Sequence, residues 1–456
     1  EKSDLDFTLL TLEKPVTGVE PKKLDYPDVN ERKIVQLMVP ERVIENSNNL
    51  SLFERVPVQF SVIPGISTNG LLNANSTNNI SLNLLAGYSQ GTDGIEIGSL
   101  VNINRTDMNG LQIAGVANVT GRFMRGVQMA GMFNYTGLLF DGFQLAGMGN
   151  ISMGDMTGAQ LSGFCNILRG KMDGAQLSGF ANFTTENVEG MQLAGFINIA
   201  AKDVEVAQLS GCINYSRNIE GMQLAGLLNV ATNRVSSTQI SGFANYAKIS
   251  NGGQISGYVN LATELNSGVQ LSPFVNYARQ NDGIQFGMFN YADTSSGGIS
   301  IGLLSIEKKG LHAIDISTSE NLITSLSFRT GNYRFYNIFG VGFSEEFVMP
   351  TYGIGTAPSL GKRLRLNLDL TASGLFEYEN TQWGQERYYF QFFTGLNYQP
   401  FKKFGVVLGP TLNFFRTQRR LEDQINPLSS YDFFHENAAD YFQQLWIGGK
   451  LSVRLF

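Results

Sequence analysis

Residues 190–198 read GMQLAGFIN, and variants of this phrase return every 15 or 16 residues between positions 94 and 291. Each copy carries a Gln, then Ala or Ser, then Gly, a large apolar residue and an Asn. The Gln column holds Glu96 in its first slot, then Gln112, Gln128, Gln144, Gln160, Gln176, Gln192, Gln208, Gln223, Gln239, Gln254, Gln270 and Gln285. The Asn column, six residues later, holds Asn102, Asn118, Asn134, Asn150, Asn166, Asn182, Asn198, Asn214, Asn229, Asn245, Asn260 and Asn276. Such a period is too short for helix pairs, so each repeat is predicted to be one strand and one turn.

The repeat has one apolar face and one mixed face. With the Gln as position zero, positions −1, +1, +3, +5 and +7 share a face, because strand side chains alternate. In the repeat of Gln192 these positions are Met191, Leu193, Gly195, Ile197 and Ile199. No repeat places a charge in these columns. The other face carries Gln, Ala or Ser, a large apolar residue at +4, and Asn.

Two architectures can use such a strand. A parallel solenoid stacks Gln on Gln and Asn on Asn as ladders; an up-and-down barrel alternates two kinds of strand and turn. From Gln208 onward the Gln spacings run 15, 16, 15, 16, 15, and position +7 alternates between aromatic and aliphatic residues. This two-repeat period favours the barrel.

We therefore predict an all-β protein whose residues 55–456 form a large antiparallel transmembrane β-barrel of roughly 20–24 strands. The alternative is a β-solenoid followed by a C-terminal barrel. The predicted barrel contains the repeat array (94–291) and C-terminal strands (299–456), among them the alternating segments 364–370, 404–414 and 445–456. Residues 1–54, charged and proline-containing, are predicted to be a periplasmic extension, a linker or a plug segment.

The barrel prediction assigns roles to two sets of residues. Polar side chains expected to line the lumen are Gln176, Asn182, Gln192, Asn198, Gln208 and Asn214. Aromatic side chains expected to form half of an interfacial girdle are Tyr215, Tyr246 and Tyr277. The large apolar residues at +4, such as Phe180 and Phe196, are expected to obstruct the lumen or pack on a plug.

The composition limits the classes of function. Charged residues make up only 16% of the chain and the net charge is −6. The sequence has no uncharged apolar stretch long enough for a transmembrane helix. It also has no basic patch that would indicate a nucleic-acid partner. The two histidines, His312 and His435, lie in separate contexts without a constellation of ligands. We predict no enzymatic activity, no catalytic residue, no metal and no cofactor.

Several segments together resemble a known family. They are residues 62–70 (VIPGISTNG), 80–89 (ISLNLLAGYS), the QLAG repeats, 297–304 (GGISIGLL) and 328–332 (FRTGN). This combination, over about residues 55–345, resembles a Bacteroidota family of cell-envelope proteins built on surface repeats. Members commonly carry an upstream carboxypeptidase-regulatory-like domain, which is lacking here and suggests a processed or partial precursor. The resemblance implies the outer membrane of a Gram-negative bacterium, but no biochemical activity.

Three functions follow as hypotheses. The leading one is a structural or accessory subunit of an envelope complex for protein insertion, secretion or uptake. Its partners would be outer-membrane lipid or lipopolysaccharide and other outer-membrane or periplasmic proteins. The alternatives are an outer-membrane channel or uptake pore, and a surface-exposed repeat adhesin.

Overall fold

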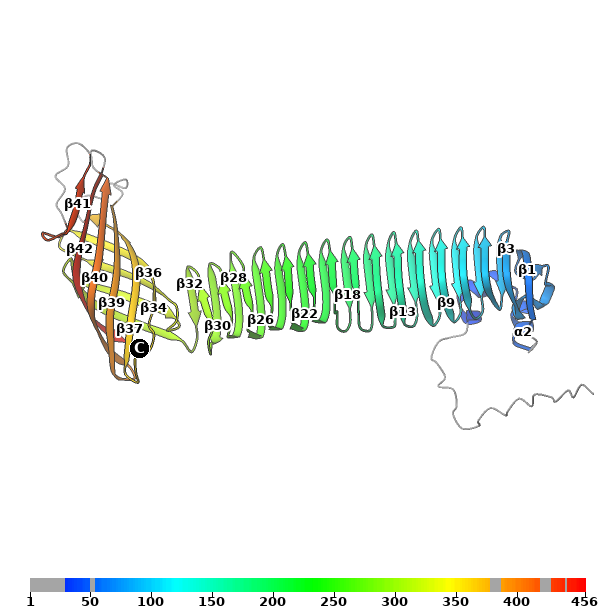
Figure 1. Cartoon of the computed structure of the whole chain (residues 1–456), viewed down its shortest axis with the longest axis horizontal. Coiled ribbons are helices and arrows are strands. Elements are labelled where there is room, and N and C mark those ends of the chain that lie inside the picture. Colours follow the sequence, from blue (N-terminus) through cyan, green and yellow to red (C-terminus); the bar gives the residue numbers. More distant parts are fainter. Residues whose placement is uncertain (1–28, 50–53, 378–386, 419–427, 439–440) are drawn as a thin grey trace, which may run out of the picture. The chain divides into compact units, whose positions relative to one another are not determined.

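The computed structural model describes residues 29–49, 54–377, 387–418, 428–438 and 441–456. It divides into two compact units, residues 1–171 and 172–456, and each is described by itself. Strands dominate both units (Figure 1). Among the described residues, no helix has the length and apolar character needed to cross a membrane.

The first unit is a stack of coils, each with two short strands. The described part of this unit begins with η1 (Val29–Glu31), α1 (Lys33–Met38) and α2 (Glu41–Asn49). The strands then form two rows, and β2 (Ile66–Ser67) and η2 (Gly70–Asn75) lie in the chain between the first two strands of one row. One parallel row is β1 (Glu54–Ile63), β3 (Ser76–Asn83), β5 (Gly91–Gly98), β7 (Met108–Ala114), β9 (Phe123–Ala130), β11 (Leu139–Ala146) and β13 (Met156–Ser162). The other is β4 (Ala86–Ser89), β6 (Val101–Asn104), β8 (Ala117–Thr120), β10 (Phe133–Thr136), β12 (Gly149–Ser152) and β14 (Cys165–Leu168).

Successive coils pair in parallel and in register, so that each column stacks on itself. Gln144 of β11 is opposite Gln160 of β13, and Asn150 of β12 is opposite Asn166 of β14. The predicted single antiparallel barrel over residues 55–456 is therefore wrong. The alternative, a β-solenoid followed by a separate barrel, is confirmed. Each repeat also contains two strands rather than the one expected, because the chain turns at the second Gly of the phrase.

The helices of the first unit cover part of its outer surface. Val35 of α1, with Val39 and Val43, packs against the outward residues of β4, β6 and β8. These outward residues include Tyr88, Val101, Ile103, Ala117 and Val119, all buried. The apolar outer face of the coils is thus a surface that can be covered, and a helical segment of this chain covers it here.

The second unit begins with the same kind of coil. One parallel row is β15 (Met172–Ser178), β17 (Met191–Ala194), β19 (Ala207–Ser210), β21 (Met222–Ala225), β23 (Thr238–Ser241), β25 (Gly253–Ser256), β27 (Val269–Leu271), β29 (Ile284–Phe286) and β31 (Ile299–Ile301). The other is β16 (Ala181–Thr184), β18 (Ile197–Ala200), β20 (Ile213–Ile219), β22 (Leu228–Val235), β24 (Ala244–Ser250), β26 (Val259–Asn266), β28 (Val275–Asn281), β30 (Phe289–Thr294) and β32 (Leu304–Glu307).

The alternation of 15 and 16 residues has a local cause. Where β20 pairs with β22, the register shifts between Ser216 and Asn218, and similar shifts recur between β22, β24, β26 and β28. A β-bulge absorbs the extra residue of the longer coil. The spacing therefore reports bulges and not two kinds of hairpin.

The glycine at +3 is required by the stacking of coils. A Cβ on Gly195 would lie 2.1 Å from the carbonyl oxygen of Gly179 in the preceding coil, and the same contact recurs along the column. No side chain fits at that distance. The glycines thus allow the backbones of neighbouring turns to approach closely.

Residues 311–455 form a closed antiparallel barrel of eight strands. Its strands are β33 (Leu311–Ser319), β34 (Leu322–Gly331), β35 (Tyr336–Phe343), β36 (Phe347–Thr356), β37 (Leu364–Gly374), β39 (Arg387–Phe401), β40 (Phe404–Gln418) and β42 (Tyr441–Leu455). Two short strands, β38 (Phe376–Glu377) and β41 (Phe434–Asn437), pair with β36 and β42. The pairing of β33 with β42 closes the ring. The strands predicted at 364–370, 404–414 and 445–456 are confirmed.

Candidate functional site: the barrel interior and the outer faces of the coils

The interior of the barrel holds a network of paired charges. Arg329 of β34 donates from Nε to Asp315 of β33 (2.6 Å) and from Nη2 to Asp369 of β37 (2.8 Å). Arg454 of β42 donates to both carboxylate oxygens of Asp315, at 2.7 and 2.8 Å. The hydroxyl of Tyr336 donates to Asp369 (2.6 Å). All four charged residues are at most 2% exposed. Two cations and two anions balance among these four residues, and Lys450 of β42 is a further basic side chain beside them.

Further polar groups fill the interior toward the other end of the barrel. Glu320, in the β33–β34 turn, accepts hydrogen bonds from Asn413 (2.7 Å) and from the indole of Trp446 (3.2 Å). Tyr389 donates to Asn413 (2.8 Å). The interior is therefore occupied by bonded side chains, as expected for a barrel of this width.

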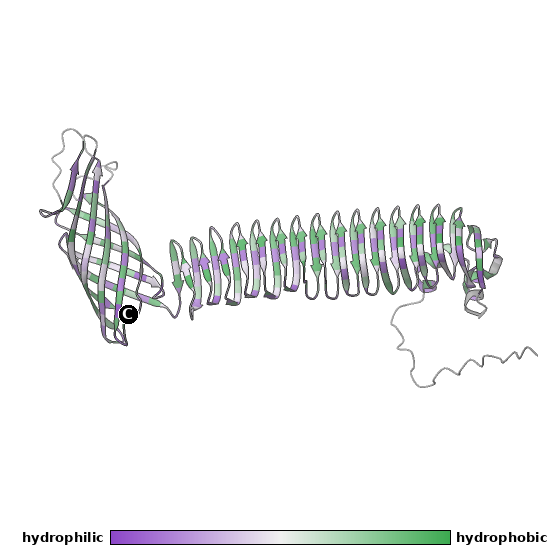
Figure 2. Cartoon of the chain, in the orientation of Figure 1, coloured by the Kyte–Doolittle hydropathy of each residue, from purple (hydrophilic) through white to green (hydrophobic). Residues whose placement is uncertain are grey.

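The outer wall of the barrel is apolar. Along the strands, hydrophilic and hydrophobic residues alternate (Figure 2). Leu408 and Leu412 of β40 and Ile447 of β42 point outward and are 61%, 42% and 65% exposed. Their inward neighbours Thr411 and Asn413 are buried. This polarity is the reverse of that of a water-soluble domain.

The predicted lumen residues lie inside the coils and not in a barrel lumen. Gln176, Asn182, Gln192, Asn198, Gln208 and Asn214 are all fully buried. The reason is that each coil closes on itself, so its mixed face points into a narrow core. The expectation that these six residues line a wide lumen is therefore wrong.

These amides form two ladders that run in opposite directions. Gln208 donates from Nε2 to Gln192 of the preceding coil (2.8 Å). Asn198 donates from Nδ2 to Asn214 of the following coil (3.0 Å) and to the carbonyl of Leu209 (2.7 Å). Each amide finds a partner because the same residue recurs in the same place.

Glu96 occupies the Gln column of the first unit as a buried carboxyl group. It accepts hydrogen bonds from Asn104 (2.6 Å), Gln112 (2.8 Å) and Asn83 (3.0 Å). Burial raises the pKa of Glu96 above its ordinary value of 4.5, against the opposing effect of these hydrogen bonds.

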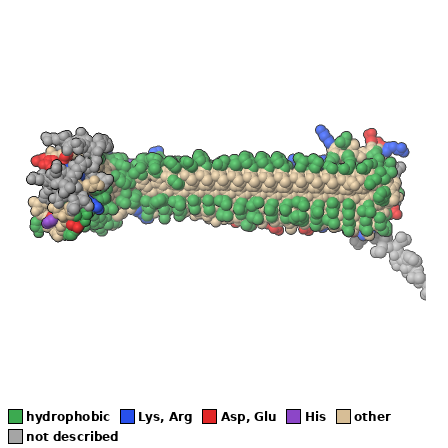
Figure 3. Space-filling view, turned by 90° about the horizontal axis from the view of Figure 1, so that it is seen from above, with side chains coloured by type: hydrophobic (Ala, Val, Ile, Leu, Met, Phe, Trp, Pro, Cys, Tyr) green, Lys and Arg blue, Asp and Glu red, His purple; other side chains and the backbone are tan. Residues whose placement is uncertain are grey.

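The large apolar residues at +4 point outward and obstruct no lumen. Phe180 and Phe196 are 40% and 43% exposed, and their rings stack with centroids 5.1 Å apart. Seen from the side of the turns, hydrophobic side chains follow the array in two rows (Figure 3). The expectation that these residues fill a lumen is wrong, because the tight turn at Gly and +4 exposes both positions.

The predicted girdle tyrosines lie on the coils and not at the rim of a large barrel, so that assignment is wrong. Tyr215, Tyr246 and Tyr277 belong to β20, β24 and β28, and each points outward. Tyr277 stacks on Tyr291 with ring centroids 5.6 Å apart. In each of these three coils the tyrosine lies close to the end that carries charged residues, where the apolar face ends.

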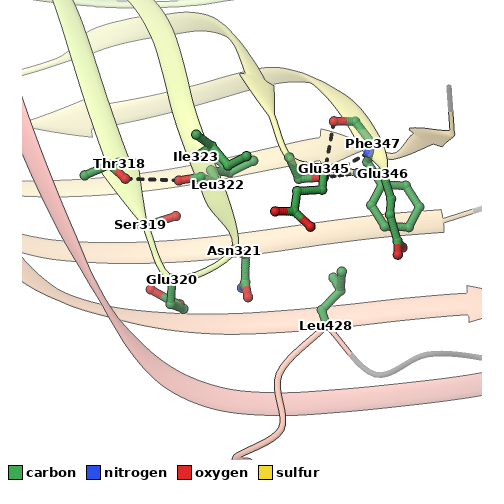
Figure 4. A pocket seen from close by; sticks show the side chains of 11 residues that line it. Thr318, Ser319, Glu320, Asn321, Leu322, Ile323, Glu345, Glu346, Phe347 and Leu428 are labelled. Atoms are coloured by element: carbon green, nitrogen blue, oxygen red, sulfur yellow. Dashed lines mark hydrogen bonds between the residues drawn. The ribbon is translucent and has the colours of Figure 1, made fainter.

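A cleft of about 500 Å³ opens at the end of the barrel where β33 meets β34 and β35 meets β36. It is lined by the β33–β34 and β35–β36 turns and by Leu428 (Figure 4). Glu345 and Glu346 stand opposite the apolar Leu322 and Ile323.

Neither histidine belongs to a cluster of ligands. His435 is exposed and lies 3.3 Å from Asp432, while His312 is in β33. Within the described ranges, no group of three His, Cys, Asp or Glu side chains could hold a metal ion.

The sequence pattern identified the residues of the outward apolar columns but not their place. They were expected in the wall and lumen of a large barrel, and they lie on the outer faces of the coils. The signal was the identity of residues within each column. Amide ladders require Gln over Gln, which only parallel, in-register pairing supplies. Comparison with known proteins finds no matching family model, curated protein or solved structure.

Proposed function

We propose that residues 311–455 anchor this protein in an outer membrane and that it acts there as a non-enzymatic structural or accessory subunit. The observation that carries this proposal is the reversed polarity of the barrel. Burying the network of Asp315, Arg329, Asp369 and Arg454 inside while exposing leucine, isoleucine and phenylalanine outside is favourable only against lipid.

The dimensions of the barrel support the same proposal. A transmembrane strand needs about 9–11 residues. The strands β34, β36 and β37 have 10, 10 and 11 residues, and β39, β40 and β42 have 15 each. A closed ring also leaves no unpaired sheet edge in the wall, which the hydrocarbon region demands.

The occupied interior favours an anchor over a channel. The ion network and the Tyr389–Asn413–Glu320 group leave polar side chains bonded to one another across the barrel. We therefore expect no conductance above the detergent background when the folded protein is added to planar bilayers. Discrete conductance steps would favour the pore hypothesis instead.

The anchor is tested by folding the full chain into detergent micelles and lipid vesicles. A folded transmembrane barrel is expected to migrate differently on gel electrophoresis before and after heating, and to resist extraction from vesicles at high pH. A full chain that folds and stays monodisperse without detergent would contradict the proposal. The accessory role is tested separately by cross-linking in native membranes, where a protein always recovered alone is not a subunit.

A further inference from the structure

The outward columns of the second unit form one continuous uncharged surface. It includes position +1, with Leu193, Leu224 and Leu271 at 40%, 39% and 40% exposed. It continues through position +4, with Phe196, Phe243 and Phe274 at 43%, 52% and 44% exposed. Positions +5 and +7 extend it over the second row of strands. The surface therefore wraps around three sides of every coil between residues 191 and 306.

This surface is too large to remain in water. The coils advance about 4.8 Å each, so the surface is roughly 40 Å long. The largest apolar patch on a typical monomer is only about 300–600 Å². Something must cover these faces, as α1 and α2 cover the outward residues of β4, β6 and β8 in the first unit.

Charges are confined to the opposite edge. The far ends of the Asn strands and the turns after them carry the exposed charges of the coils: Lys202, Glu205, Arg217, Glu220, Arg234, Lys248, Glu264 and Arg279. Tyr215, Tyr246 and Tyr277 stand between this edge and the apolar faces. Each coil thus passes from apolar faces through tyrosine side chains to a charged edge. This order is typical of an element that lies at a membrane interface.

The last coil contacts the outer wall of the barrel. Asn337 of β35 accepts from the amide of Ser305 (2.8 Å) and donates to the carbonyl of Gly302 (2.7 Å). Thr330 of β34 donates to the carbonyl of Ser305 (3.2 Å). Because Arg329 and Tyr336 point inward, their neighbours Thr330 and Asn337 point outward. The coils of this unit therefore leave the barrel from its outer wall beside the β34–β35 turn, where Asn332 and Arg334 also donate to the carbonyls of Gly298 and Gly297.

We propose that the apolar faces of the coils over residues 191–306 are covered by acyl chains of the bilayer leaflet around the barrel. This inference rests on the proposed anchor. A protein partner fits less well. Protein–protein interfaces contain about one hydrogen bond per 100–200 Å², and these apolar columns offer few side-chain donors or acceptors. The relief is also irregular: position −1 reads Met191, Ala207, Met222, Thr238, Gly253, Val269 and Ile284. Fluid chains fill such a surface without voids.

The test uses the full chain in phosphatidylcholine vesicles, with Cys165→Ser and Cys212→Ser as background. Phe196→Cys reports the apolar edge and Lys202→Cys the charged edge of the same coil. Leu408→Cys reports the barrel wall. Each cysteine carries bimane, and quenching is measured with phospholipids brominated in the acyl chains. The heat-dependent gel shift verifies that each variant is folded.

We expect Phe196→Cys to be quenched as strongly as Leu408→Cys, and Lys202→Cys to stay unquenched. Quenching at 408 without quenching at 196 overturns the inference and leaves the anchor standing. No quenching at either position overturns both proposals. Disulfide-linked dimers of the unlabelled Phe196→Cys protein, without quenching of the labelled one, assign the surface to a second copy. If quenching at 196 persists after detergent has replaced the bilayer, the apolar surface is covered by individually bound lipid molecules. That result overturns the proposal that a bilayer leaflet covers it.

Discussion

At the scale of the residue, glycine at +3 fixes how closely coils stack. Substituting Gly195 with Ala is expected to destabilise the array by about 1–3 kcal/mol, because the new methyl group overlaps the carbonyl oxygen of Gly179. The measurement is urea unfolding of the full chain, followed by circular dichroism. Gly253→Ala is the control, since its methyl group meets nothing closer than 3.6 Å. Equal destabilisation by both variants would show that backbone freedom, and not contact, explains the column.

The buried carboxyl group of Glu96 predicts a pH dependence. Its pKa is raised in the folded state, so folding favours the protonated form. Its contribution to the unfolding free energy is complete below pH 4.5 and is lost as pH rises through the raised pKa. Glu96→Gln is expected to remove this dependence, measured as the difference between the two proteins in unfolding free energy at each pH. Parallel pH profiles would contradict the prediction.

At the scale of the element, α1 holds the outer face of the first coils. Val35 is fully buried, whereas Leu37 on the same helix is 85% exposed. Val35→Ala is expected to cost about 1.5–3 kcal/mol locally, and Leu37→Ala less than about 0.5 kcal/mol. Hydrogen exchange of the amides in β6 and β8 measures this, with faster exchange expected only for Val35→Ala. Unchanged exchange in both variants would mean that the helix does not protect these strands.

The barrel network makes a second prediction at this scale. Asp315 pairs with both arginines, so Asp315→Asn leaves buried positive charge unbalanced and is expected to destabilise the barrel by about 3–5 kcal/mol. Lys248→Gln, which removes the exposed Lys248–Glu264 pair at 3.8 Å, is expected to change stability by less than about 1 kcal/mol. The temperature of the gel-shift transition compares the two. A barrel indifferent to Asp315→Asn would show that the network does not stabilise it.

The strands of the barrel could be predicted from sequence more fully than those of the repeats. In β37 and β40 the alternation of outward leucines with inward Asn367 and Asn413 defines both strand and face. In the repeats the same alternation fits a barrel wall and a solenoid flank equally well. The direction in which neighbouring strands pair distinguishes a barrel wall from a solenoid flank. This direction is a property of the tertiary structure and cannot be read from one strand. The Asp315–Arg329–Asp369–Arg454 network was not predicted, because its members lie on separate strands far apart in sequence.

At the scale of the whole molecule, coils are interchangeable units. Deleting residues 191–206 joins Gly190 to Ala207 and keeps every column in phase, so we expect a folded protein about 4.8 Å shorter in the array. Deleting 191–202 shifts the columns by four residues and is expected to disrupt stacking. Circular dichroism melts and the gel shift of the barrel distinguish the two deletions. Equal loss of structure would contradict the repeat-by-repeat account of stability.

The contact of Gly302 and Ser305 with Thr330 and Asn337 also bears on aggregation. A parallel stack of amide ladders resembles the core of an amyloid fibril, and its open end is a template for further strands. Here the barrel wall takes up hydrogen-bonding groups that the last coil would otherwise offer to a foreign chain. The barrel therefore blocks the addition of further strands to the last coil. Fibril growth from that end requires this coil first to dissociate from the barrel wall.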